Sequence, residues 1–146
     1  MSKFFQALLS GMFFTFILDF FIFLGVKLNY IDHYGIDLYY NILFADNQNI
    51  YLYAVSSTIL GFLITYIDNY RISITVIGTL SILSLLTLVP PVGYKVGAIM
   101  LMEKNKTLYD SRHTYIGDIY YDGRDEISFY DKELKKIITL DKKELK

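Results

Sequence analysis

Hydrophobic residues fall into three long runs in the N-terminal part of the chain: Phe4 to Val26, Ile50 to Ile67 and Ile72 to Val89. Each run is 18 to 23 residues long. A helix of that length, rising about 1.5 Å per residue, crosses a hydrocarbon core of about 30 Å. The pattern therefore predicts three transmembrane helices. We expect a transmembrane domain over residues 1–92, followed by a small extramembrane β-rich domain over residues 93–146.

Composition agrees with a lipid environment for the first domain. Hydrophobic residues make up 53% of the chain and aromatic residues 17%, which is more apolar surface than a small water-soluble domain buries. No small-residue cleavage site follows the first run, and two further runs come after it. We therefore expect the first run to be a retained helix and not a secretory signal.

The connector between the second and third runs is only four residues long, Asp68 to Arg71. A connector this short predicts that the two helices are antiparallel neighbours. Each helix also carries two small residues four positions apart, a spacing that lets helix backbones approach closely in lipid. These pairs are Ser57 with Gly61 and Thr75 with Thr79. The sequence leaves open whether either pair faces the other helix.

The first loop, Lys27 to Asn49, is rich in tyrosine. Its candidate interfacial tyrosines are Tyr30, Tyr34, Tyr39 and Tyr40. Tyrosine is enriched at headgroup depth because its ring is apolar and its hydroxyl is hydrated. We expect the loop to lie on the membrane surface, with a short helix over Ile36 to Phe44. Two roles remain open for it, a docking surface for a partner and an interfacial anchor.

Prolines mark the end of the third run. Pro90 and Pro91 lack a backbone N–H and are predicted to end the helix. The next segment, Val92 to Met102, is apolar but contains Lys95 and is too short to cross a bilayer. We expect it to be an interfacial segment or the first strand of the β-rich domain.

Alternating residues after Lys104 predict a β-meander of three or more strands. The expected strands are Tyr115 to Tyr121, Glu126 to Tyr130 and Lys135 to Leu140. Asp122-Gly123 suits the tight turn between the first two. Alternation places three apolar pairs on one face of the sheet. These pairs are Ile119 with Tyr121, Ile127 with Phe129, and Ile138 with Leu140.

Asp19 stands inside the first apolar run. An isolated carboxylate deep in a helix costs about 2.5–3.5 kcal/mol on insertion scales, so we expect a polar partner. Counting equal depths along antiparallel helices predicts a layer of hydroxyl groups beside Asp19. The members of this intramembrane polar layer are Asp19, Ser56, Ser57, Thr58, Ser81 and Ser84. The layer is expected either to set helix packing or to handle a proton or ion.

Signals for catalysis, metals and cofactors are weak. His33 has Asp32 and Asp37 nearby, but their spacing matches no metal motif, so we expect no metal site. No phosphate-binding glycine loop is present, so we expect no cofactor. The formal net charge of −1 gives no basic surface for nucleic acid. We therefore expect a protein that is not an enzyme and does not bind nucleic acid.

The leading hypothesis is a non-enzymatic accessory or scaffold subunit of a larger bacterial inner-membrane complex. It would dock through its transmembrane helices, first loop and β domain, with the lipid bilayer and other membrane subunits, or itself, as partners. The alternative is a homo-oligomeric proton or cation channel or transporter that uses Asp19.

Orientation follows from charge. Few basic residues in the first loop predict a cytoplasmic N-terminus and a β domain on the outer side. Lys95, Lys104 and Lys106 argue for the opposite orientation.

Overall fold

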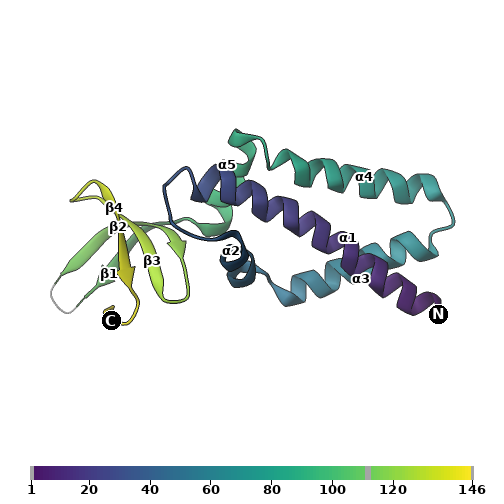
Figure 1. Cartoon of the computed structure of the whole chain (residues 1–146), viewed down its shortest axis with the longest axis horizontal. Helices are drawn as coiled ribbons and strands as arrows, with labels where there is room; N and C mark the ends of the chain where they lie inside the picture. The colour runs from purple at the N-terminus through teal and green to yellow at the C-terminus, as the bar shows by residue number, and fades with distance from the viewer. Residues whose placement is uncertain (1, 111–112, 146) are drawn as a thin grey trace.

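Helices and sheet occupy opposite ends of an elongated molecule (Figure 1). The computed structural model describes residues 2–110 and 113–145. The helices are α1 (Lys3–Val26), a π-helical turn η1 (Lys27–Ile31), α2 (Tyr40–Asn47), α3 (Ile50–Tyr66), α4 (Tyr70–Leu86) and α5 (Pro90–Leu101). The strands are β1 (Glu103–Tyr109), β2 (Thr114–Asp122), β3 (Glu126–Asp131) and β4 (Lys136–Asp141). The predicted combination of apolar helices with a small sheet is present.

One helix is clearly long and apolar enough to cross a membrane. It runs without a break from Lys3 to Ile31. The pair α2 and α3 bends by 85° and the pair α4 and α5 by 90°, so three spans result only if each bent pair counts as one. Alone, α3 and α4 have 17 residues each, or about 25 Å of helix. The structure thus supports part of the three-span prediction.

Asparagine side chains determine where α3 and α4 begin. The Asn49 side chain accepts hydrogen bonds from the backbone N–H groups of Tyr51 and Leu52, both at 3.0 Å. The Asn69 side chain accepts one from the Arg71 N–H at 3.2 Å. These caps satisfy donors that have no partner within the helix.

The segment after α4 is a helix. Pro90 and Pro91 stand at the first positions of α5, where a missing N–H costs nothing. The expectation of a first strand within Val92 to Met102 is therefore wrong. A further strand that was not predicted, β1, begins at Glu103, separated from the end of α5 only by Met102.

The closest helix packing joins α1 and α3, which run antiparallel. A side chain at Gly11 would place its Cβ 1.8 Å from the Ser57 carbonyl oxygen, and one at Gly61 would place it 2.0 Å from the Ala7 carbonyl oxygen. Ala7 with Gly11 on α1 therefore faces Ser57 with Gly61 on α3, in the small-residue mode of close packing.

The predicted hairpin of α3 and α4 is a minor contact. The Ser73 hydroxyl of α4 donates to the Leu63 carbonyl of α3 at 3.1 Å, close to their connector. At its other end α4 reaches α1, where the Thr87 hydroxyl donates to the Phe21 carbonyl at 2.9 Å. The pair Ser57 and Gly61 thus packs on α1 and not on α4.

The four strands form an antiparallel meander in the order β1-β2-β3-β4. Asp131 shapes the turn after β3, since its carboxylate accepts from the backbone N–H groups of Glu133 and Leu134 at 2.7 and 3.0 Å. The pairings Ile127 with Leu140 and Phe129 with Ile138 confirm the face predicted for these four residues.

A β-bulge at Tyr120 changes the face of one predicted residue. Ile119 pairs with Phe129, whereas Tyr121 pairs with Ser128, so Tyr120 has no partner across the ladder. An extra residue reverses the alternation of side chains beyond it. Tyr121 therefore faces the helices while Ile119 faces the sheet's own core. The prediction that Ile119 and Tyr121 share a face is wrong.

The helix contact makes a testable prediction. Gly11→Ala places a methyl group against the Ser57 carbonyl and should lower the free energy of unfolding by about 1–3 kcal/mol. Gly78→Ala is the matched control, because nothing lies within 4 Å of a Cβ at Gly78. It should be neutral or stabilise α4 by up to about 1 kcal/mol. Thermal unfolding in detergent measures both, and equal effects of the two substitutions would refute the contact.

Candidate functional site

Side chains from distant parts of the sequence meet between the helices and the sheet. We call this buried group the junction core; its members are Phe23, Val26, Tyr30, Ile31, Leu43, Leu101 and Tyr121. They come from α1, η1, α2, α5 and β2. The first loop therefore supports the sheet, and only part of it is free to act as a membrane-surface anchor.

The four candidate loop tyrosines separate into different environments. Tyr30 is fully buried, while Tyr39 is 71% exposed. Tyr34 is partly buried against the junction core, and the Tyr40 hydroxyl donates to the Phe20 carbonyl of α1 at 3.2 Å. Tyr30 and Tyr34 thus join the sheet to the helices, and Tyr39 is the exposed member of the set.

Tyr30 binds the bulge directly. Its hydroxyl donates to the carbonyl oxygen of Tyr120 at 2.9 Å. A bulge leaves backbone groups without ladder partners, and burial makes an unsatisfied carbonyl costly. The hydrogen bond from Tyr30 therefore gives the bulge residue's carbonyl a donor from outside the sheet.

Further tyrosines extend this contact. The hydroxyls of Tyr34 and Tyr94 share a hydrogen bond of 2.5 Å, and the ring centroids of Tyr34 and Tyr120 lie 4.1 Å apart. Burial, followed by the hydrogen bond with Tyr94, raises the pKa of Tyr34 above its ordinary value. The Tyr34 hydroxyl is therefore a neutral hydrogen-bonding group at physiological pH.

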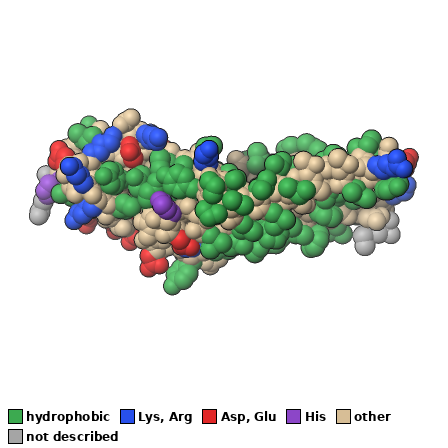
Figure 2. Space-filling view, turned by 90° about the horizontal axis from the view of Figure 1, so that it is seen from above, with side chains coloured by type: hydrophobic (Ala, Val, Ile, Leu, Met, Phe, Trp, Pro, Cys, Tyr) green, Lys and Arg blue, Asp and Glu red, His purple; other side chains and the backbone are tan. Residues whose placement is uncertain are grey.

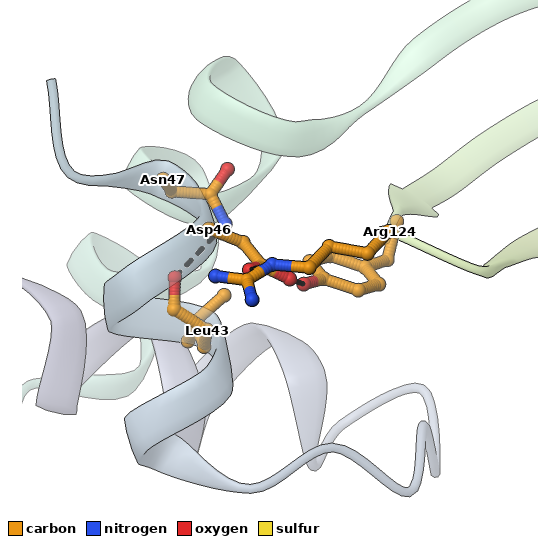
Figure 3. Close-up of polar contacts among 5 residues, drawn as sticks. Leu43, Asp46, Asn47 and Arg124 are labelled. Carbon is orange, nitrogen blue, oxygen red and sulfur yellow. Dashed lines mark hydrogen bonds and ion pairs between the residues drawn. The ribbon is translucent and has the colours of Figure 1, made fainter.

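A buried carboxylate makes a second link between α2 and the sheet (Figure 3). The Asp46 side chain is 7% exposed and forms an ion pair with Arg124 of the β2–β3 turn. The Tyr121 hydroxyl donates to the other carboxylate oxygen of Asp46 at 3.1 Å. Burial and the charge of Asp46 raise the pKa of Tyr121. The same α2 turn is closed by Asn47, whose amide donates to the Leu43 carbonyl at 3.0 Å.

Two clefts flank the junction core. The first, of about 430 Å³, has an apolar wall that includes Ile36 and Leu38 and a polar rim of mostly acidic side chains. Its charged residues are Asp37, Asp46, Arg124, Asp125 and Glu126. We call it the acidic cleft. The second, of about 500 Å³, lies between α5 and the sheet.

Asp19 has a different polar partner from the one predicted. Gln48, in the break between α2 and α3, donates its side-chain amide to the Asp19 carboxylate at 2.8 Å. The predicted hydroxyls bond or pack elsewhere: Ser57 faces Gly11, Thr58 donates to the Ala54 carbonyl, Ser84 donates to the Ser81 carbonyl, and Ser56 is partly buried on α3. The predicted layer is therefore distributed over several levels of the helices.

The depth of Asp19 also differs from the prediction. Gln48 precedes the first residue of α3, and Thr87 follows the last residue of α4 at the level of Phe21. Asp19 therefore lies near the end of the length that the three helices share. If these helices cross a bilayer, the carboxylate would lie nearer its surface than its centre, where the cost of a charge is smaller.

Several residues of this site were not identified from the sequence as functional candidates: Asp46, Gln48, Tyr121 and Arg124. The polar run Asp46 to Asn49 was the available signal for the break between α2 and α3. The alternation of residues in β2 gave no sign of the bulge.

A scan against protein-family models found no match, and searches of curated proteins and of solved structures found none either.

The bond from Tyr30 to the bulge can be tested by removing one atom. Tyr30→Phe keeps the ring in the junction core but removes the hydroxyl that donates to the Tyr120 carbonyl, which should cost about 1–3 kcal/mol. Hydrogen exchange in β2 should become faster as well. Tyr39→Phe is the control, because Tyr39 is exposed. If Tyr30→Phe unfolds like the unaltered protein, the bond does not hold the sheet.

Asp19 offers a second test. Asp19→Asn keeps an oxygen that accepts from Gln48 and removes the charge, so thermal stability in detergent should be unchanged or higher. Asp19→Ala removes the acceptor and should lower stability by about 1–2 kcal/mol. If Asn is as damaging as Ala, the stabilising contact depends on the charge and not on the hydrogen bond.

Proposed function

We propose that this protein is a non-enzymatic accessory or scaffold subunit of a larger bacterial inner-membrane complex. The observation that carries the proposal is the junction core, which fixes the sheet to the apolar helices through buried rings, a bulge carbonyl and the Asp46–Arg124 ion pair. Such a connection presents a small sheet at a defined distance and angle from the bilayer.

The surface supports this role. On the face shown in Figure 2, many hydrophobic side chains lie over the helical region, while most of the charged side chains gather toward the two ends of the molecule. Ile59 on α3 and Ile82 on α4 are each 61% exposed. Exposed apolar surface of this kind suits lipid or the helices of another subunit.

The acidic cleft offers a docking surface outside the bilayer. Its apolar wall and acidic rim would suit a partner segment that combines a basic residue with an apolar one. A partner in contact with both this cleft and the helices would be held on two sides of the junction core. Which membrane face carries the sheet stays a prediction from charge, with the outer face expected.

The channel alternative has less support. The Asp19 carboxylate accepts from Gln48 of its own chain, and it lies near the end of the shared helix length. A role in packing the break between α2 and α3 accounts for both facts.

Site-specific photo-cross-linking in intact cells tests the proposal. A photoreactive residue at Ile59, Ile82 or Asp125 should cross-link to one and the same partner, a protein whose sequence differs from this chain. Leu134 in the β3–β4 turn is the distant control. Cross-links only to further copies of this chain would favour the homo-oligomeric alternative. A chain that gives no cross-link from any of the three positions would refute the scaffold role.

A further inference from the structure

The cleft between α5 and the sheet combines an apolar side with a polar one. Ala98, Ile99 and Met102 supply apolar lining, and Lys104, Asp118 and Tyr120 supply polar lining, around a volume of about 500 Å³. A cleft of this size holds a small ligand or a lipid headgroup. Its two-sided lining points to an amphipathic ligand.

If α4 spans the bilayer, the position of α5 puts this cleft at headgroup depth. The helix turns 90° from α4 and packs on residues that follow Phe21 in the first helix. Gly93 approaches the Gly25 carbonyl, and Gly97 lies against the Tyr30 side chain. Because α4 ends at the level of Phe21, α5 lies just beyond the apolar region, where phosphates and glycerol groups are found.

The outward side of α5 fits that environment. Ile99 is 85% exposed, and Lys95, four residues earlier, is also exposed. An apolar side chain beside a lysine on an interfacial helix is the usual arrangement for contact with acyl chains and phosphates together.

Charge favours an anionic ligand. Within residues 2–110 and 113–145, neither Lys95 nor Lys104 forms an ion pair. The acidic residue of the cleft, Asp118, already accepts from the Asn105 N–H at 2.7 Å and lies 3.7 Å from the Lys132 ammonium. Its charge is therefore balanced within the sheet, and Lys104 remains available for a phosphate.

We propose that this cleft binds the headgroup of an anionic phospholipid. Lys104, which lines the cleft, holds the phosphate, and an acyl chain lies along Ile99 toward the apolar helices. Lys95 stands outside the cleft lining, one turn of α5 before Ile99, and adds positive charge on the same helix. The bound lipid fills the gap between α5 and β2 and so strengthens the junction core from its open side. This binding is independent of any protein partner.

Native mass spectrometry of the full chain in detergent tests the site. With equal amounts of phosphatidylglycerol and phosphatidylcholine, the unaltered protein should retain phosphatidylglycerol at least severalfold more often. Its thermal midpoint should rise with phosphatidylglycerol and stay unchanged with inorganic phosphate, which lacks the acyl chain.

Lys95→Gln combined with Lys104→Gln should abolish both the preference and the shift. Lys136→Gln combined with Lys143→Gln removes the same charge from β4 and the turn after it, and should leave both in place. Equal retention of the two lipids by the unaltered protein would overturn the proposal. Equal loss in both double variants would also overturn it, because net charge would then explain the preference.

Discussion

The bulge at Tyr120 is the feature on which the arrangement of the two halves depends. One extra residue in β2 turns Tyr121 toward the helices, and the backbone carbonyl of the bulge residue, Tyr120, lies within hydrogen-bonding distance of Tyr30. Tyr30 satisfies that carbonyl and Asp46 accepts from Tyr121. A regular β2 would put Tyr121 on the face of Ile119 and remove the bond to Asp46. The irregularity in the strand is therefore what joins a sheet to a helix bundle.

The sheet gains from this connection because it is small. Its own core consists of Ile119, Ile127 and Phe129 with a few partly buried neighbours, and a domain of this size buries little apolar surface by itself. The junction core adds a second buried layer on the opposite face. The same contact that orients the sheet therefore also stabilises it.

The long apolar runs and the alternation of the strands made the coarse fold predictable. Single irregularities of the backbone, such as the bulge in β2, could not be predicted. The apolar runs indicated the helices, and alternation with Asp122-Gly123 indicated the meander. The polar partner of Asp19 was predicted from equal spacing along the helices, whereas Gln48, which lies before α3, donates to it. The tyrosines of the first loop were recognised as special by composition, but the hydrogen-bond partners of Tyr30 and Tyr34 lie 90 and 60 residues away in sequence. Local pattern carries no information about such distant pairs.

The unequal lengths of the helices affect the surrounding lipid. If α3 and α4 span the bilayer, their 17 residues each provide about 25 Å of apolar length against a hydrocarbon thickness of about 30 Å. Such hydrophobic mismatch is relieved when the bilayer thins around the protein or when short helices cluster, at a cost of a fraction of a kcal/mol for each ångström. The protein would therefore thin the membrane beside α3 and α4. It would also partition into thin membrane regions, or beside neighbours with equally short spans, because mismatch is smaller there, and no specific contact is needed.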